Sequence, residues 1–203
     1  GMLPDIDISL FSYIGNSSLS GAYAMLTSDQ SREKVDELAR SMTYLELSTE
    51  PGYMDAFIAA CTTEDMTQAD CLRACYEAVR ALRYLGRNPA YGPEVKTIPY
   101  EMQLEFAGKI LSTGKGDCYN FAAVFCLLAR KLGYLASPIV GECGYSWNWY
   151  PIAHGWVEIE MDGTTYLFDP QIENYNLRVG ISNETHSAWQ VTYESAPARY
   201  LKH

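Results

Sequence analysis

The sequence is organised around one short stretch, Gly114-Lys115-Gly116-Asp117-Cys118-Tyr119-Asn120. From Cys118 onward, apolar residues recur at the three- and four-residue spacing of a helix face, and Gly133 ends this pattern. The other faces of the segment are apolar too, so we expect a helix that is buried nearly all round. Asp117 is suited to cap its first turn. The stretch therefore predicts a turn that delivers a cysteine to the start of a buried helix.

Cys118 is a candidate nucleophile because of this position. The first turn of a helix has backbone N–H groups without intrahelical partners, and the helix dipole favours negative charge there, so both favour a thiolate. The same N–H groups can bind a developing oxyanion. A single cysteine is also often a small buried hydrophobic residue, so the assignment needs support from elsewhere in the chain.

Composition limits the classes of function. The chain has 203 residues, 48% of them hydrophobic and 20% charged, which is typical of a globular protein. Its net charge of −10 argues against a nucleic-acid partner, and no apolar run is long enough to span a membrane. No signal peptide is visible, which favours a cytoplasmic location, although removal of a leader would leave the same sequence. The charge also means that a neutral or basic substrate meets less long-range repulsion than an acidic one.

The six cysteines are too sparse for a small disulfide-stapled domain, and we expect most of them to be reduced thiols in the core. A structural zinc site would need further ligands at finger-like spacing, which the three histidines do not supply. We therefore expect no metal and no organic cofactor. The cysteines are Cys61, Cys71, Cys75, Cys118, Cys126 and Cys143.

The N-terminal half is predicted to be mainly helical. Residues 1–60 form an expected helical extension that packs on a core of residues 61–203. In the extension, a helix begins at Ser28 or Asp29 and runs to about residue 47. The further predicted elements are a helical turn or two at 54–61, a helix from Thr67 to near Gly86, a loop at 87–99 and a helix at 100–112.

After Gly133 the pattern changes to that of strands. We expect short strands at 138–141, 153–160 and 165–168, an aromatic-rich loop at 143–151, and a tight turn at Asp162-Gly163. The alternation of Tyr175, Leu177, Val179 and Ile181 suggests another strand. The remainder of the chain, to His203, is consistent with either an edge strand or a tail.

The turn at Asp162-Gly163 fixes a strand register that brings two polar residues together. If Met161 faces Thr164, then Val157 faces Phe168 and one side of the hairpin is consistently apolar. His154 and Asp169 then share the other side as diagonal neighbours, roughly 7–8 Å apart at their Cα atoms. A histidine and a carboxylate at this separation can interact, and together with a cysteine they meet the requirements of thiol catalysis.

The sequence at this point resembles the bacterial transglutaminase-like domain family. The resemblance covers about residues 64–175, including Tyr84 near the end of the helix that precedes the cysteine. It is carried by the segments Gly116-Asp117-Cys118-Tyr119-Asn120-Phe121-Ala122, Leu128-Ala129-Arg130-Lys131-Leu132-Gly133-Tyr134, Val140-Gly141, His154-Gly155-Trp156-Val157-Glu158-Ile159 and Tyr166-Leu167-Phe168-Asp169-Pro170. Many members carry alanine where this chain has Gly155.

The resemblance implies an α+β, papain-like fold in which a buried cysteine-bearing helix packs on an antiparallel sheet, here with extra N-terminal helices. It also implies a catalytic triad of Cys118, His154 and Asp169 in a cysteine enzyme that acts on amide or peptide carbonyls through a thioester, either a protease or amidase or a protein transamidase. The expected partner is a peptide or protein. The family's oxyanion-hole side chain cannot be placed, and the backbone N–H of Cys118 is the expected donor.

The aromatic loop leads directly into His154, so its residues are candidates for substrate binding, alone or as a lid over the core. The candidates are Trp147, Trp149 and Tyr150, with Trp156 on the following strand. Two other classes of function remain open. One is a non-catalytic module that binds peptide or cell-wall material on the same scaffold, and the other is a purely structural interaction domain.

Overall fold

The computed structural model describes residues 52–86, 96–147 and 151–203. The predicted helix ending near residue 47 and most of the expected extension at 1–60 lie outside the described residues. In chain order the described elements are α5 (Gly52–Cys61), α6 (Gln68–Arg80), β1 (Arg83–Tyr84), α7 (Tyr100–Thr113), β2 (Lys115–Gly116), α8 (Cys118–Lys131), β3 (Leu135–Gly144), β4 (Ile152–Met161), β5 (Thr164–Phe168), α9 (Pro170–Val179) and β6 (Arg199–Lys202).

The central helix α8 begins and ends as predicted. The Asp117 carboxylate accepts hydrogen bonds from the backbone N–H groups of Tyr119 at 3.0 Å and Asn120 at 3.2 Å, and the Asn120 side chain accepts from the N–H of Asp117. This reciprocal arrangement is a capping box, which satisfies donors that the helix itself leaves unpaired. All residues of α8 from Cys118 to Ala129 are buried, and Gly133 takes the left-handed conformation with φ 93°. The expected buried helix is confirmed.

The sheet has four antiparallel strands in the order β5-β4-β3-β6. The turn at Asp162-Gly163 has positive φ at both residues, as a tight hairpin of this length requires. Val157 pairs with Phe168 and Met161 pairs with Thr164, so the predicted register is confirmed. The strand β3 is longer than expected, and the chain end supplies β6 as an edge strand.

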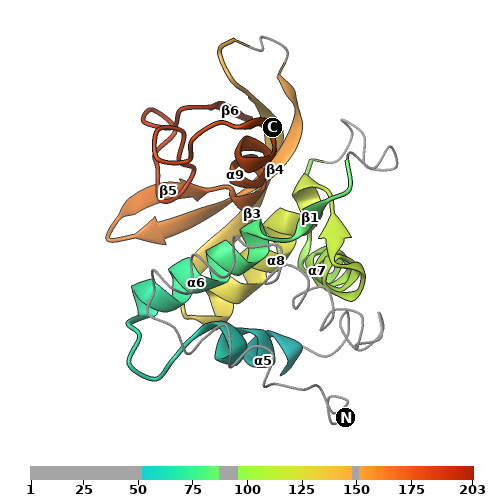
Figure 1. Ribbon diagram of the computed structural model, residues 1–203, viewed down its shortest axis with the longest axis vertical. Coiled ribbons are helices and arrows are strands. Elements are labelled where there is room, and N and C mark those ends of the chain that lie inside the picture. The colour runs from blue at the N-terminus through green and yellow to red at the C-terminus, as the bar shows by residue number, and fades with distance from the viewer. Residues whose placement is uncertain (1–51, 87–95, 148–150) are drawn as a thin grey trace.

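Helix α8 lies between the sheet and the other helices, and the main core forms around it. It contacts β3 and β4 on one side and α5, α6 and α7 elsewhere, as Figure 1 shows. Phe125 of α8 makes ring contacts with Tyr76 of α6 at 5.3 Å and with Phe168 of β5 at 5.8 Å between centroids. The mixed helix and antiparallel-sheet class predicted from the sequence is confirmed. In the described residues, no helix is long and apolar enough to cross a membrane.

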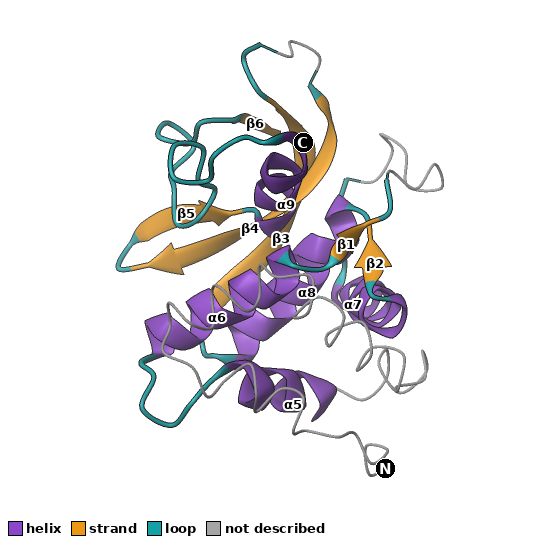
Figure 2. Cartoon of the chain, viewed as in Figure 1, coloured by secondary structure: helices purple, strands orange, loops and turns teal. Residues whose placement is uncertain are grey.

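One predicted element is wrong. Residues 175–181 were expected to form a strand, but they belong largely to α9, which follows β5 directly (Figure 2). The Asp169 carboxylate caps this helix, Pro170 occupies its first turn and Gly180 ends it in the left-handed conformation. These are standard helix boundaries. These helix caps outweigh the apolar alternation of the segment, which by itself favours a strand.

The helix predicted at 67–86 also ends earlier, at Arg80. The residues after it form β1, which pairs in parallel with β2, so that Tyr84 lies opposite Gly116. This short pairing places Tyr84 next to the turn that leads into Cys118.

Candidate active site

The structure brings Cys118, His154 and Asp169 together from three different elements. Cys118 is the first residue of α8, His154 lies on β4, and Asp169 is the N-cap of α9. His154 Nε2 lies 2.6 Å from Asp169 Oδ2, as the hairpin register predicted. All three are buried, with exposed fractions of 5%, 5% and 0%.

His154 is held between a carboxylate and a thiol. Burial by itself would lower the pKa of His154, but the charge and hydrogen bond of Asp169 and the interactions with Cys118 outweigh it and raise this pKa well above its usual value. The imidazolium form is therefore favoured at neutral pH. Because Nε2 faces Asp169, Nδ1 is the ring nitrogen left for Cys118.

Asp169 has a full set of hydrogen bonds. Its Oδ1 accepts from the backbone N–H groups of Gln171 and Ile172, and its Oδ2 accepts from His154 and from the Tyr200 hydroxyl at 2.8 Å. Burial and the Asp169 charge raise the pKa of Tyr200 well above its usual value, so the phenol stays protonated and donates. Sequence reasoning missed Tyr200, because nothing near it indicates a site until β6 pairs with β3.

A second thiol lies close to the pair of His154 and Asp169. Potential metal-ligand atoms of Cys143, His154 and Asp169 all lie within 4.8 Å of one another, and this is the cluster in the described residues that resembles a metal site. The facing atoms of His154 and Asp169 are already hydrogen-bonded to each other, so an ion would have to break that bond. Burial raises the pKa of Cys143 to about 12, which keeps it a neutral thiol.

A cavity of about 290 Å³ opens onto Cys118 and His154. Most of its wall is aromatic or apolar, with Gln171 and Arg178 as further polar groups. The described residues that line it are Tyr84, Cys118, Cys143, Gly144, Tyr145, Trp147, Ile152, Ala153, His154, Gln171, Ile172, Tyr175 and Arg178.

The candidate substrate-binding residues differ in their placement. Trp147 lines the cavity, is 60% exposed and stacks on Tyr145 with ring centroids 4.4 Å apart. Trp149 and Tyr150 lie outside the described residues. Trp156 is fully buried, its indole N–H donates to the Tyr193 hydroxyl, and it is not part of the cavity wall.

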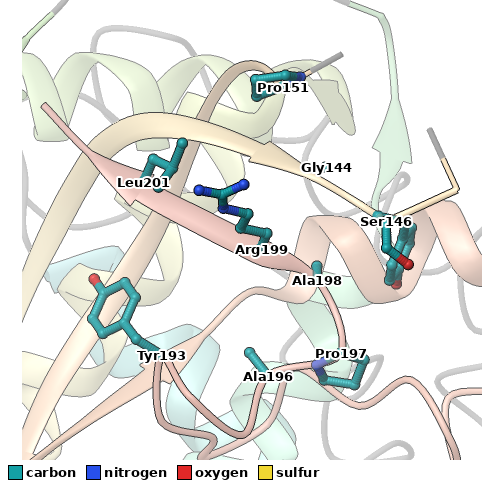
Figure 3. A pocket seen from close by; sticks show the side chains of 10 residues that line it. Gly144, Ser146, Pro151, Tyr193, Ala196, Pro197, Ala198, Arg199 and Leu201 are labelled. Atoms are coloured by element: carbon teal, nitrogen blue, oxygen red, sulfur yellow. The ribbon is translucent and has the colours of Figure 1, made fainter. Parts of the chain in front are cut away.

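A second cavity has a volume of about 320 Å³. Figure 3 shows part of its lining: Arg199 and Leu201 lie on β6, and Tyr193, Pro197 and Ala198 lie on the segment that leads into this strand. It shares Gly144 and Tyr145 with the first cavity but contains none of the three candidate catalytic residues. Of these two cavities, the smaller is therefore the one that Cys118 and His154 line.

Tyr84 lies near the thiol as well. Burial raises the pKa of its phenol, and charges on Cys118, His154 and Asp117 are near enough to influence it. The hydroxyl is therefore protonated at neutral pH and can donate a hydrogen bond. Tyr84 precedes Cys118 by more than thirty positions, and the pairing of β1 with β2 brings it opposite Gly116.

Comparison with known proteins supports this fold. A family model described as the transglutaminase-like superfamily matches residues 55–170, more than half of the chain. A second family model, the C-terminal domain of RACo, the ASKHA domain, matches residues 1–72, which is less than half of the chain and lies mostly outside the described residues. Among curated proteins, none matches the chain. With its mixed helix and sheet core and its buried cysteine, histidine and aspartate, the chain belongs to the transglutaminase-like superfamily.

Proposed function

We propose that the protein is a cysteine enzyme that transfers an acyl group from an amide or peptide carbonyl through a thioester. The observation that supports this most directly is the environment of His154, whose pKa is raised by Asp169 on one side and Cys118 on the other. An imidazole held by a carboxylate beside a thiol at a helix start is the arrangement that thiol catalysis requires, with the sulfur as the nucleophile.

In the first stage, Cys118 Sγ attacks the carbonyl carbon and the carbon–nitrogen bond breaks. His154 gives its proton to the leaving amine or ammonia, and a thioester to Cys118 remains. Asp169 holds the ring orientation and stabilises the imidazolium, since its Oδ2 receives the Nε2–H.

The oxyanion that forms in this stage needs donors. As the first residue of α8, Cys118 has a backbone N–H without an intrahelical acceptor. We assign the second donor to the Tyr84 hydroxyl, because Tyr84 lines the same cavity and interacts with Cys118.

In the second stage, water or an amine attacks the thioester and His154 accepts its proton, which releases an acid or a new amide. Hydrolysis and transamidation share every residue named so far. The acceptor that enters the cavity decides between them.

The test is intact-protein mass spectrometry after incubation with a library of glutamine-containing peptides, with and without added amines. We expect a mass increase equal to a peptide minus ammonia, and this adduct should disappear faster when an effective amine acceptor is present. Peptide mapping should locate the adduct at Cys118.

Matched variants make the result specific. Cys118→Ala should abolish the adduct, whereas Cys143→Ala, which removes the other thiol of the same cavity, should leave it at Cys118. If no peptide forms an adduct and iodoacetamide alkylates Cys118 no faster than the buried Cys126, the proposal is wrong and a non-catalytic binding module becomes the better explanation.

A further inference from the structure

One arginine stands at the wall of the cavity near the candidate catalytic residues. Arg178 lies in the last turn of α9, and its guanidinium sits over the ring of Tyr84 at 4.8 Å and over that of Tyr175 at 5.7 Å. Its Nε–H donates to Asn174 Oδ1 at 3.2 Å, one helical turn back. These contacts hold the guanidinium in one orientation, which reduces the entropy lost when it binds a ligand.

The terminal nitrogens of Arg178 have no carboxylate partner among the described residues. Arg80 shows the contrast, because it is paired with Glu77 and Glu173 in the core. A guanidinium prefers planar, two-oxygen acceptors and presents its donors as a fork that matches a carboxylate. Arg178 is therefore a fixed cation with its best hydrogen-bonding edge available.

The cavity wall differs in charge from the protein as a whole. The chain has 25 acidic and 15 basic residues, yet the described part of the cavity wall contains Arg178 and His154 and neither Asp nor Glu. A cleft with cationic groups and an apolar wall concentrates the field of those groups and attracts anions at short range. The net charge of −10 therefore does not describe what a substrate meets inside the cavity.

The position of Arg178 on α9 gives an approximate spacing. Asp169 caps the start of α9 and Arg178 lies nine positions later, about 13 Å along the axis at 1.5 Å per residue. Helical side chains lean back toward the N-terminus, so the guanidinium lies closer to the start of α9 than its Cα atom does. Arg178 and Cys118 line one cavity of about 290 Å³, so a substrate of a few peptide residues can contact both.

We propose that Arg178 binds a carboxylate of the substrate, located within a few residues of the carbonyl that Cys118 attacks, and thereby selects acidic peptides. This inference rests on the proposed function, since it names the substrate class of the same site. The carboxylate can come from an Asp or Glu side chain or from a peptide C-terminus, and both present the same planar group.

The experiment measures how well short peptides protect Cys118 from iodoacetamide. The probes are acetyl-Ala-Ala-Gln-Ala-Ala-amide and versions with one Ala replaced by Glu or by Met, which is neutral and of similar size. A further version ends in a free carboxylate in place of the amide. Protection reports binding without requiring turnover, and mass spectrometry of the tryptic peptide reads alkylation at Cys118 alone.

We expect at least one Glu peptide to protect about tenfold better than its Met counterpart, which is the usual size of one charge-assisted contact at a partly exposed site. Arg178→Gln should abolish this preference, and Arg178→Lys should restore only part of it because lysine lacks the fork. Lys96→Gln, which removes an exposed charge outside the cavity, should keep the preference. Higher salt should reduce the preference of the wild type for Glu peptides.

The outcomes separate this inference from the proposed function. If iodoacetamide alone alkylates Cys118 no faster than Cys126, the proposed function fails. If alkylation is fast but Glu and Met peptides protect equally, or if Arg178→Gln weakens both equally, Arg178 only steadies Tyr84 and the inference is wrong. Absence of protection by all acidic peptides at millimolar concentration overturns it too. Preference for a Glu side chain or for the free C-terminus identifies the source of the carboxylate.

Discussion

At the scale of single residues, one carboxylate oxygen organises the candidate site. Asp169 Oδ2 accepts hydrogen bonds from both His154 and Tyr200, while Oδ1 caps α9. Hydrogen bonds to an ionised acceptor are stronger than those between neutral groups, and a buried ion without them is costly. Tyr200 therefore has the position of a group that holds the Asp169 carboxylate aimed at His154.

Replacing Tyr200 by Phe should lower the free energy of unfolding by about 1.5–3 kcal/mol, the usual range for a hydrogen bond to a charged group. Tyr145→Phe is a matched control, because the Tyr145 hydroxyl is also buried but donates to a neutral acceptor, Asn176 Oδ1 at 2.7 Å. Its cost should be about 0.5–1.5 kcal/mol. Denaturant unfolding of both variants measures the difference, and equal costs would show that Tyr200 does not serve the carboxylate.

The raised pKa of His154 predicts how its charge depends on pH. Side-chain NMR should show His154 still protonated at pH 7. In Asp169→Asn the largest favourable interactions are lost and burial remains, so the pKa should fall below the usual 6.5.

The same shift has a consequence for stability. A raised pKa in the folded state means that the ion pair stabilises fully below about pH 6.5 and that this contribution is lost as pH rises through the higher folded value. In Asp169→Asn, where the His154 pKa should lie below 6.5, that dependence should reverse, so that stability rises with pH through this range. An unchanged His154 titration in Asp169→Asn would contradict the assignment of the shift to Asp169.

At the scale of elements, the features that the sequence predicted correctly are those that a few neighbouring residues determine. The capped helix at Cys118 and the hairpin at Asp162-Gly163 are both encoded within a few residues, and the hairpin register alone placed His154 beside Asp169. The α9 helix was mistaken for a strand, although Asp169-Pro170 and Gly180 are local signals too. Tyr200, Arg178 and Cys143 were not predictable as site residues, because only the packing of β6, α9 and β3 brings them to the cavity or to Asp169.

The close contact of β4 with α8 is possible because residue 155 is a glycine, which has no side chain. A Cβ atom on Gly155 would lie 2.8 Å from Tyr119 Cδ1 and 3.6 Å from the carbonyl oxygen of Cys118. Gly155→Ala should therefore displace the first turn of α8, cost about 1–3 kcal/mol of stability and slow alkylation of Cys118 by iodoacetamide.

A second substitution tests the mechanism of that effect. Tyr119→Leu removes the ring that the new methyl group meets, so Gly155→Ala should cost less in the Tyr119→Leu background than in the wild type. Additive losses in this double-mutant cycle would mean that the contact with Tyr119 is not the cause.

At the scale of the whole molecule, a buried ionic network ties the helical layer to the site. Arg80 of α6 pairs with Glu173 of α9 at 2.9 Å, and Tyr76 of α6 donates to the same carboxylate at 2.7 Å. The Asn174 side chain donates to the backbone carbonyl of Arg80. Because Asp169 caps α9, these contacts also fix the carboxylate that orients His154. Such a network is invisible in sequence, since its members are more than ninety positions apart.

Glu77 of α6 makes this network sensitive to pH. Burial raises its pKa to about 7 from an ordinary 4.5, against the opposing effects of Arg80 and Arg73 and with a smaller contribution from Glu173. A carboxyl with a raised folded pKa stabilises the protein most below its unfolded value and loses that contribution as pH rises through about 7.

The wild-type free energy of unfolding, relative to that of Glu77→Gln, should therefore fall by roughly 3 kcal/mol between about pH 4.5 and 8. Urea unfolding of both proteins at several pH values gives this difference directly, and subtraction removes the contributions of groups they share, including His154. Glu101→Gln changes an exposed carboxyl at the start of α7, and its free energy of unfolding should depend on pH in the same way as that of the wild type. Parallel curves for Glu77→Gln as well would mean that Arg73 and Arg80 outweigh burial and keep Glu77 ionised throughout.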